Sequence, residues 1–103
     1  MYIVTVTFEI TPAHYAEFMS AMLANAASSL SEEPGCKQFD VCESSAEERA
    51  VFLYEAYDSA QDFQHHLATP HFVEFNTMTQ AWVKNKEVKV YNRLSPALSL
   101  EKN

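Results

Sequence analysis

The chain has 103 residues, the size of one ordinary domain, and we expect a single domain over residues 1–95 followed by a loose tail over residues 96–103. Its 14 acidic and 7 basic residues give a formal net charge of −7, which repels phosphate backbones and so argues against nucleic acid as a partner. No apolar run approaches the roughly 20 residues that span a bilayer, and the first residues alternate in polarity, unlike an export signal, so a cytosolic protein with no membrane partner is expected.

The first third of the chain predicts a strand followed by a long helix. Residues 2–10 alternate between apolar and more polar side chains, the period of two that is typical of a β-strand. Thr11 and Pro12 end this strand and suit the N-cap and the first position of a helix. Over residues 15–30, apolar side chains recur at steps of three and four, which predicts an amphipathic helix with one buried stripe. The proline and glycine at 34–35 close that helix.

Two further strands are predicted over residues 36–43 and 50–57, and the polar turn between them indicates a hairpin. The second strand has bulky groups on both of its faces. Helices can cover only one face of such a sheet, and a face open to water should be polar. We therefore expect a second copy of the chain to stack on the other face, giving a homodimer. The bulky side chains are Phe52 and Tyr54 on one face, and Val51, Leu53 and Tyr57 on the other.

The last third predicts two short helical segments and a final strand. Ser59, followed three residues later by Asp62, is a capping signal for the first segment. The Thr69-Pro70 pair interrupts this segment and starts the second, and residues 87–94 return to a strand. The order strand, helix, strand, strand, helical segment, strand predicts a ferredoxin-like α+β fold, with an antiparallel sheet and helices on one of its faces.

Four stretches of sequence point to a family. They are Phe-Leu-Tyr-Glu-Ala-Tyr at 52–57, His-His-Leu-Ala-Thr-Pro-His-Phe at 65–72, Glu-Pro-Gly-Cys at 33–36 and Phe-Asp-Val at 39–41. In these stretches the chain resembles the antibiotic biosynthesis monooxygenase family, near its quinol monooxygenase and autoinducer-2 isomerase-like members. The resemblance covers nearly the whole chain. It implies a dimeric α+β barrel, in which two sheets face each other and each subunit keeps a pocket between its sheet and its helices.

The resemblance also implies an activity without a cofactor. In the oxygenase members, an electron-rich phenolic substrate reduces dioxygen itself once it is deprotonated, so no flavin, metal or haem is needed. We therefore expect a cofactor-independent monooxygenase whose partners are a small quinol or polycyclic phenol, dioxygen and a second copy of itself. Two alternatives stay open: an isomerase of a small phosphorylated dicarbonyl of the autoinducer-2 degradation type, and a non-catalytic dimer that binds a small molecule.

Two departures from the family narrow this choice. The haem-degrading branch pairs an asparagine on the first strand with a tryptophan at the end of the third. Here those places are taken by Thr5 or Thr7 and by Tyr57, so haem breakdown is disfavoured. The isomerase branch has a histidine just after the asparagine of the first helix, where this chain has Ala26, and this ranks the isomerase second.

His66 and His71 are the candidate general bases. An imidazole titrates near neutral pH, and these two flank the break between the helical segments, where a helix start can aim a base inward. The alternative for each is a packed histidine whose nitrogen is satisfied by a structural hydrogen bond. His65 and His14 are expected to face solvent.

Tyr54, Tyr57 and Asn25 are candidates to orient a substrate oxygen. The two tyrosines lie on opposite faces of one strand, so at most one of them can point into a pocket on the helix side. Each tyrosine is alternatively a core or interface residue. Asn25 lies among small residues of the first helix, where it either holds a substrate carbonyl or is exposed. The expected apolar wall consists of Phe72, Phe75 and Trp82.

One glutamate and both cysteines are expected to have no role in catalysis or metal binding. Glu55 is surrounded by apolar neighbours, and an ion pair with Arg93 or Lys89 on the last strand is favoured over a catalytic role. Cys36 and Cys42 lack the spacing of zinc or redox sites and are expected to be reduced thiols, so no metal site is predicted.

Overall fold

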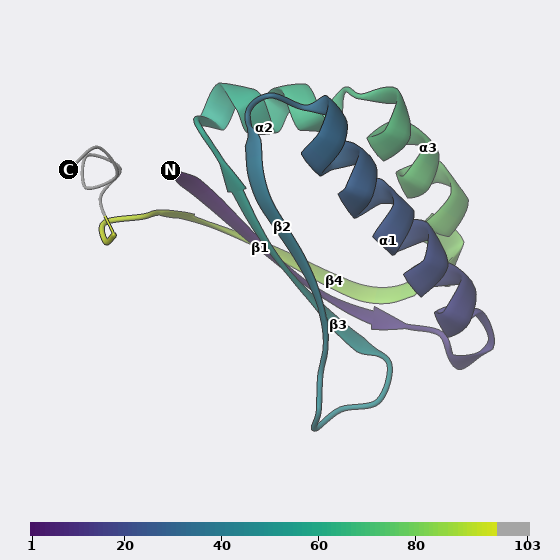
Figure 1. Ribbon diagram of the computed structural model, residues 1–103. Coiled ribbons are helices and arrows are strands. Elements are labelled where there is room, and N and C mark those ends of the chain that lie inside the picture. Colours follow the sequence, from purple (N-terminus) through teal and green to yellow (C-terminus); the bar gives the residue numbers. More distant parts are fainter. Residues whose placement is uncertain (97–103) are drawn as a thin grey trace.

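A computed structural model describes residues 1–96 of the chain, and the fold is an antiparallel four-stranded sheet with helices on one face (Figure 1). The strand order is β2-β3-β1-β4. This confirms the predicted ferredoxin-like α+β fold. The expected tail lies, apart from Pro96, outside the described residues. The elements are β1 (Tyr2–Ile10), η1 (Pro12–His14), α1 (Tyr15–Glu32), β2 (Cys36–Glu43), β3 (Ala50–Tyr57), α2 (Ala60–Leu67), α3 (Pro70–Thr79), η2 (Gln80–Trp82) and β4 (Val83–Asn92).

The register of the two central strands decides which side chains face the helices. Val6 of β1 lies opposite Leu53 of β3, and Val4 lies opposite Glu55. Because side chains alternate along a strand, this places Glu55 on the same face as Leu53, with Tyr57 one step further on. That face packs on Phe18 and Met22 of α1 and on Phe75 of α3 to form the buried core.

Capping interactions fix where α2 and α3 begin. The Ser59 hydroxyl accepts a hydrogen bond from the Asp62 backbone N–H at 3.2 Å, as the capping signal predicted. The Thr69 hydroxyl accepts one from the Phe72 N–H, also at 3.2 Å, and Pro70 occupies the first turn of α3. The chain therefore turns sharply between α2 and α3, and the two helices run in different directions (Figure 1).

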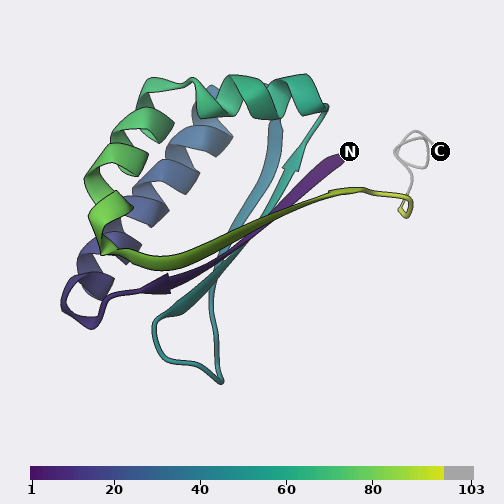
Figure 2. The ribbon, with the colours of Figure 1, turned by 180° about the vertical axis from the view of Figure 1, so that it is seen from behind.

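The last strand differs from the prediction, since β4 begins at Val83 and ends at Asn92, against the expected span of 87–94. Residues 84–86 are charged or polar and break the apolar pattern on which the prediction relied. An edge strand tolerates such residues because one of its sides faces solvent. Figure 2 shows β4 along the outer edge of the sheet, beside β1.

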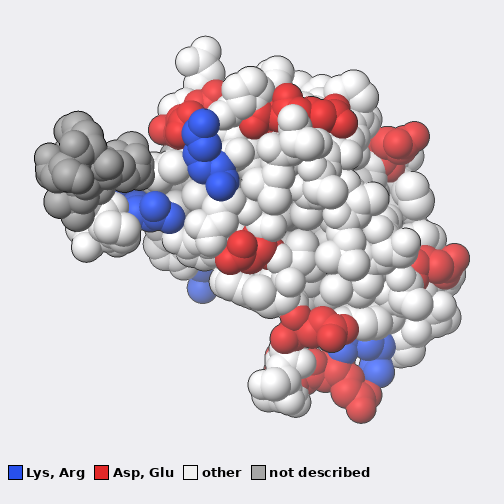
Figure 3. Space-filling model, viewed as in Figure 1, with Lys and Arg blue, Asp and Glu red and all other residues white. Residues whose placement is uncertain are grey.

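The face of the sheet away from the helices is open and partly apolar. Phe52 is 38 % exposed and Tyr91 is 49 % exposed, and both border a hollow of about 480 Å³. Thr5, Tyr54 and Arg93 also line this hollow. The chain has a net charge of −7, and Figure 3 shows that acidic side chains predominate over basic ones on one face of the molecule. None of the helices described is long and apolar enough to cross a membrane.

Candidate active site

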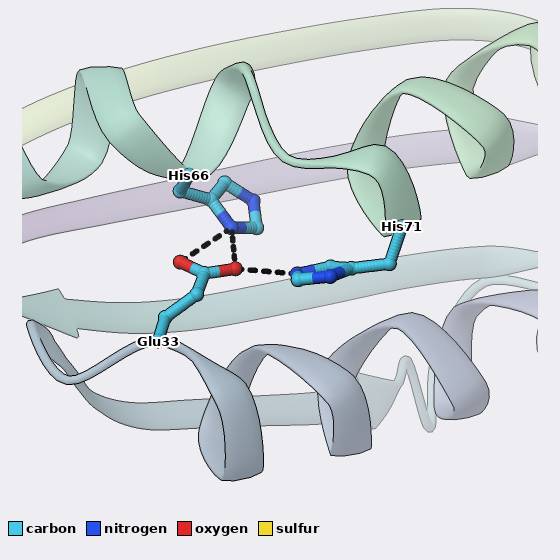
Figure 4. Close-up of side chains that lie close together, drawn as sticks. All are labelled: Glu33, His66 and His71. Carbon is cyan, nitrogen blue, oxygen red and sulfur yellow. Dashed lines mark hydrogen bonds and ion pairs between the residues drawn. The ribbon is translucent and has the colours of Figure 1, made fainter.

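Glu33, His66 and His71 form a hydrogen-bonded cluster (Figure 4). Nδ1 of His66 lies 2.9 Å from Oε2 of Glu33 and 3.1 Å from Oε1. Nε2 of His71 lies 2.5 Å from the same Oε2. One carboxylate thus joins two imidazoles that come from different helices.

Three helix ends bring this cluster together. Glu33 is the C-cap residue of α1, and its backbone N–H donates to the Ser29 carbonyl at 3.1 Å. His66 lies in the last turn of α2, and His71 lies in the first turn of α3. The break at Pro70 separates the two histidines and lets both rings turn towards the carboxylate.

Burial defines the electrostatics of the cluster. Glu33 and His66 are almost fully buried, whereas His71 is half-buried. Burial lowers the pKa of His66 below its ordinary value, although the hydrogen bond from the imidazole to Glu33 opposes this. His66 is therefore neutral near pH 7. A carboxylate only accepts hydrogen bonds, so Nδ1 of His66 is the nitrogen that donates, and the lone pair is left on Nε2.

His66 also lines a cavity of about 60 Å³ between the sheet and the helices. The polar side chains in its lining belong to Asn25, Glu55, His66 and Lys86. Within residues 1–96, Nε2 of His66 makes no hydrogen bond, so this cavity-lining residue has a free lone pair. Its apolar lining includes Phe39, Phe63, Phe72 and Phe75, together with aliphatic residues of the sheet and helices.

Asn25 is the second polar feature of this cavity. The residue is 5 % exposed, so the alternative of an exposed asparagine is wrong. Its Oδ1 is the one buried side-chain oxygen or nitrogen without a hydrogen-bond partner in the part of the chain that the structure describes. An unsatisfied buried acceptor is costly, and a hydroxyl group of a bound ligand would satisfy it.

Glu55 is the third polar feature of the cavity, and the predicted ion pair of Glu55 with Arg93 or Lys89 is wrong. Lys89 lies opposite Thr5, on the face of the sheet away from the helices, and Arg93 lies near the Tyr54 hydroxyl at 3.5 Å. Glu55 faces the helices, where burial raises its pKa from 4.5 to about 7. It therefore adds a second proton-binding group to the cavity.

Some of the predicted site residues come together and others do not. The structure brings His66, Asn25, Phe72 and Phe75 to one cavity, whereas His71 lies outside its lining and is hydrogen-bonded to Glu33. Tyr57 is fully buried outside the lining of this cavity, and its hydroxyl donates a hydrogen bond to Glu55. Tyr54 and Trp82 lie elsewhere: Tyr54 on the open face of the sheet, and Trp82 on η2, stacked on His14 at a centroid distance of 5.1 Å.

Glu33 and Glu55 were missed as members of the site, yet both left a signal in the sequence. Glu33 continues the buried stripe of α1, at a helical spacing of four residues from Ser29. Glu55 shares the parity of Leu53 and Tyr57, which are buried strand positions. An acidic residue in register with a buried face indicates a buried carboxylate.

Fold and cavity together define a ferredoxin-like α+β protein with a cavity between its sheet and its helices, lined by an imidazole that a carboxylate holds. The model of the antibiotic biosynthesis monooxygenase family matches residues 1–78, and the chain belongs to this family. No curated protein matches the chain.

Solved structures support the fold. A candidate antibiotic biosynthesis monooxygenase from Nitrosomonas europaea is 26 % identical, with a TM-score of 0.89, and the match covers 93 % of this chain and 92 % of that one. A similarly described protein from Caulobacter crescentus is 25 % identical over 91 % of this chain and 90 % of that one, with a TM-score of 0.87. A third, from Bacteroides thetaiotaomicron, is 23 % identical over 94 % and 92 %, with a TM-score of 0.88, and bears on the fold alone.

Proposed function

We propose that the protein is a cofactor-independent monooxygenase that oxidises a small quinol or polycyclic phenol, with His66 as the general base. One observation carries this proposal: Nδ1 of the buried His66 is bound to Glu33, its Nε2 has no hydrogen-bond partner within residues 1–96, and the residue lines a mostly apolar cavity. A base oriented by a carboxylate in an apolar site is suited to removing the proton of a phenol.

The proposed reaction begins when Nε2 of His66 takes a hydroxyl proton from the quinol. The phenolate then gives one electron to dioxygen, and the two radicals join in a carbon–oxygen bond. The imidazolium returns its proton to the resulting peroxide, which loses water. One oxygen atom thus becomes bonded to a ring carbon, and the other leaves as water. In sum, a quinol and dioxygen give a hydroxyquinone and water. The substrate supplies all the electrons.

Asn25 is proposed to orient the substrate, because its unpartnered Oδ1 can accept a hydrogen bond from a second hydroxyl group. The cavity volume of about 60 Å³ favours a single aromatic ring over a polycyclic one. A ring would still need the rim side chains to move, and Lys86 and Val88, both on the edge strand, are the exposed members of that rim.

Oxygen uptake tests the proposal. Purified protein is mixed with a panel of one-ring and fused-ring quinols, and the rate is compared with that of buffer. We expect His66→Ala to lower the rate by about 10²–10⁴-fold, the usual contribution of a general base. His65→Ala changes an exposed neighbour on the same helix and should leave the rate unchanged. No uptake above the buffer rate by a folded protein would reject the proposal.

The isomerase remains the second candidate, and Glu55 is the observation that favours it. Moving a proton between two carbons of a dicarbonyl needs one group to remove it and another to protonate an oxygen. His66 and Glu55 line the same cavity, and a carboxyl pKa of about 7 suits the second role. Product formation without oxygen separates the isomerase from the oxygenase. Ligand binding that survives His66→Ala, with no turnover in either assay, would indicate the non-catalytic binder.

We further propose that the protein is a homodimer in the cytosol. The partly apolar open face, with Phe52 and Tyr91 at its hollow, supports a second copy as its cover. Cys36 and Cys42 are both free thiols, which suits a reducing compartment.

A further inference from the structure

The cluster of Glu33, His66 and His71 has the donor set of a metal site. One donor atom from each residue can be chosen such that all three lie within 4.8 Å of one another. We propose that these residues bind one divalent transition-metal ion of the zinc class. Two imidazoles and one carboxylate, with a further position left for water, are a ligand set that Zn²⁺ accepts.

The geometry needs only a small change to admit the ion. Zinc bonds of roughly 2.1 Å at tetrahedral angles place neighbouring donor atoms about 3.4 Å apart. Oε2 of Glu33 now lies 2.9 Å from Nδ1 of His66 and 2.5 Å from Nε2 of His71. Each of these two separations must therefore widen by about 1 Å or less, which side-chain rotation can supply.

The charge of the cluster favours a cation. Glu33 is 4 % exposed, and in residues 1–96 its ion-pairing partners are the two histidines, with no lysine or arginine among them. A buried carboxylate is costly without a compensating positive charge. A divalent ion would supply the charge.

The outer nitrogen of His71 already has a carboxylate beside it. Nδ1 of His71 lies 3.8 Å from Oε1 of Glu32, whose side chain is 66 % exposed. Histidines that bind metals commonly donate their other N–H to a carboxylate, which fixes the ring and its tautomer. Glu32 is placed to do this for His71.

An ion also has a path to the site. A groove of about 140 Å³ between α1 and α3 is lined by His71 and by the small residues Ala21, Ala24 and Ser28. The His71 side chain is 15 % exposed, so this histidine is the ligand within reach of solvent. The ion would enter past His71, and water in the groove could complete its coordination.

A bound ion would have a definite chemical consequence, which rests on the proposed function. In the metal-free protein, Nδ1–H of His66 donates to Glu33 and Nε2 has the lone pair. When Nδ1 binds the ion, the proton of the neutral ring must move to Nε2. Nε2 then has no lone pair to accept a proton from a phenol. The ion is therefore expected to inhibit the oxygenase, which is active when free of metal.

Binding is tested on the full chain, freed of metal by a chelator, by calorimetric titration with Zn²⁺ and by the visible absorption of added Co²⁺. We expect one ion per chain and a tetrahedral cobalt spectrum. His71→Ala, at a half-buried position, should weaken binding by roughly 100-fold or more, beyond the 10–100-fold effect of outer-shell residues. Glu33→Gln should do the same, and His65→Ala should bind as the wild type does.

Thermal melting without metal shows whether each variant is folded. Zinc should then raise the melting temperature of the wild type and of His65→Ala, but not that of His71→Ala or Glu33→Gln. Equal affinity in the wild type and in His71→Ala would overturn the site, as would an equal loss in His65→Ala. Oxygen uptake separates the two proposals. Zinc that binds and inhibits supports both, while zinc that binds a protein inactive on all quinols supports the site and rejects the oxygenase. Activity that requires zinc would overturn the inhibitory role.

Discussion

The Tyr57 hydroxyl donates a 2.6 Å hydrogen bond to Oε1 of Glu55, two residues earlier on the same face of β3. Burial raises the pKa of Glu55 to about 7, although this hydrogen bond and the charge of Lys86 both lower it. Burial and the neighbouring Glu55 also raise the pKa of Tyr57 above its usual range. The pair is thus a protonated acid and a phenol at mildly acidic pH, in the centre of the core.

This pair predicts a pH dependence of stability. In the unfolded chain Glu55 ionises near pH 4.5, whereas in the folded protein it keeps its proton up to about pH 7. Between these values the folded state binds more protons, so the free energy of unfolding falls as pH rises. The full effect is about 3 kcal/mol, present below pH 4.5 and lost above pH 7.

Glu55→Gln should remove this part of the pH dependence, because the amide stays neutral. Urea unfolding at pH 5 and pH 8 gives the free energy of unfolding at each pH. The change between the two pH values, that is, the slope of this free energy with pH, should be smaller for the variant than for the wild type. Glu47→Gln, at an exposed position, is the matched control and should keep the wild-type slope. If Glu55→Gln and Glu47→Gln have the same slope as the wild type, the buried acid has an ordinary pKa.

Glu33→Gln should lower kcat on a quinol substrate with little change in KM. Glu33 lies outside the lining of the cavity and acts through Nδ1 of His66, so it positions the base and stabilises the imidazolium without touching substrate. The loss should be about 10-fold or more, but smaller than the 10²–10⁴-fold loss for the base itself. Steady-state oxygen uptake measures both constants. Glu32→Gln, one residue earlier and exposed, is the control, and a rise in KM alone for Glu33→Gln would contradict this role.

The sequence was sufficient for the fold because its signals are local. The period of two in β1, the Ser59 cap and the Thr69-Pro70 break each act within a few residues, and the structure has all three. The start of β4 was missed because the polar residues 84–86 hide an edge strand.

The sequence predicted the two histidines of the site but not the roles of its two carboxylates. His66 and His71 stood out because of their chemistry and their place beside a helix break. The carboxylate that joins them is 33 residues away from His66 along the chain, and no local pattern gives that distance. Glu55 was placed with the wrong partner because its ion pair was inferred from charge, whereas the register puts Lys89 on the other face.

Gly35→Ala should destabilise the protein through a contact with α2. A Cβ atom at Gly35 would overlap the Asp62 side chain and lie 2.6 Å from the Asp62 Cβ, so the start of the helix would have to move. The expected loss is about 1–3 kcal/mol of unfolding free energy. Chemical denaturation measures it, and the double variant with Asp62→Gly provides the check. The alanine should cost less in that background, and an equal cost in both would show that the contact is not responsible.

Phe52→Asp tests the second copy on the open sheet face. Phe52 lies beside the hollow that the partner sheet is proposed to cover, and a carboxylate buried there without a partner would be costly. Sedimentation at micromolar concentration should give twice the chain mass of 11.7 kDa for the wild type and a single chain for the variant. Leu23→Asp changes a side chain of α1 that is 54 % exposed, on the helical side, and should stay dimeric. If the wild type sediments as one chain, the open face is covered by something other than a copy of the protein, or by water. If both variants dissociate, the interface includes the helices, and the arrangement of two facing sheets is wrong.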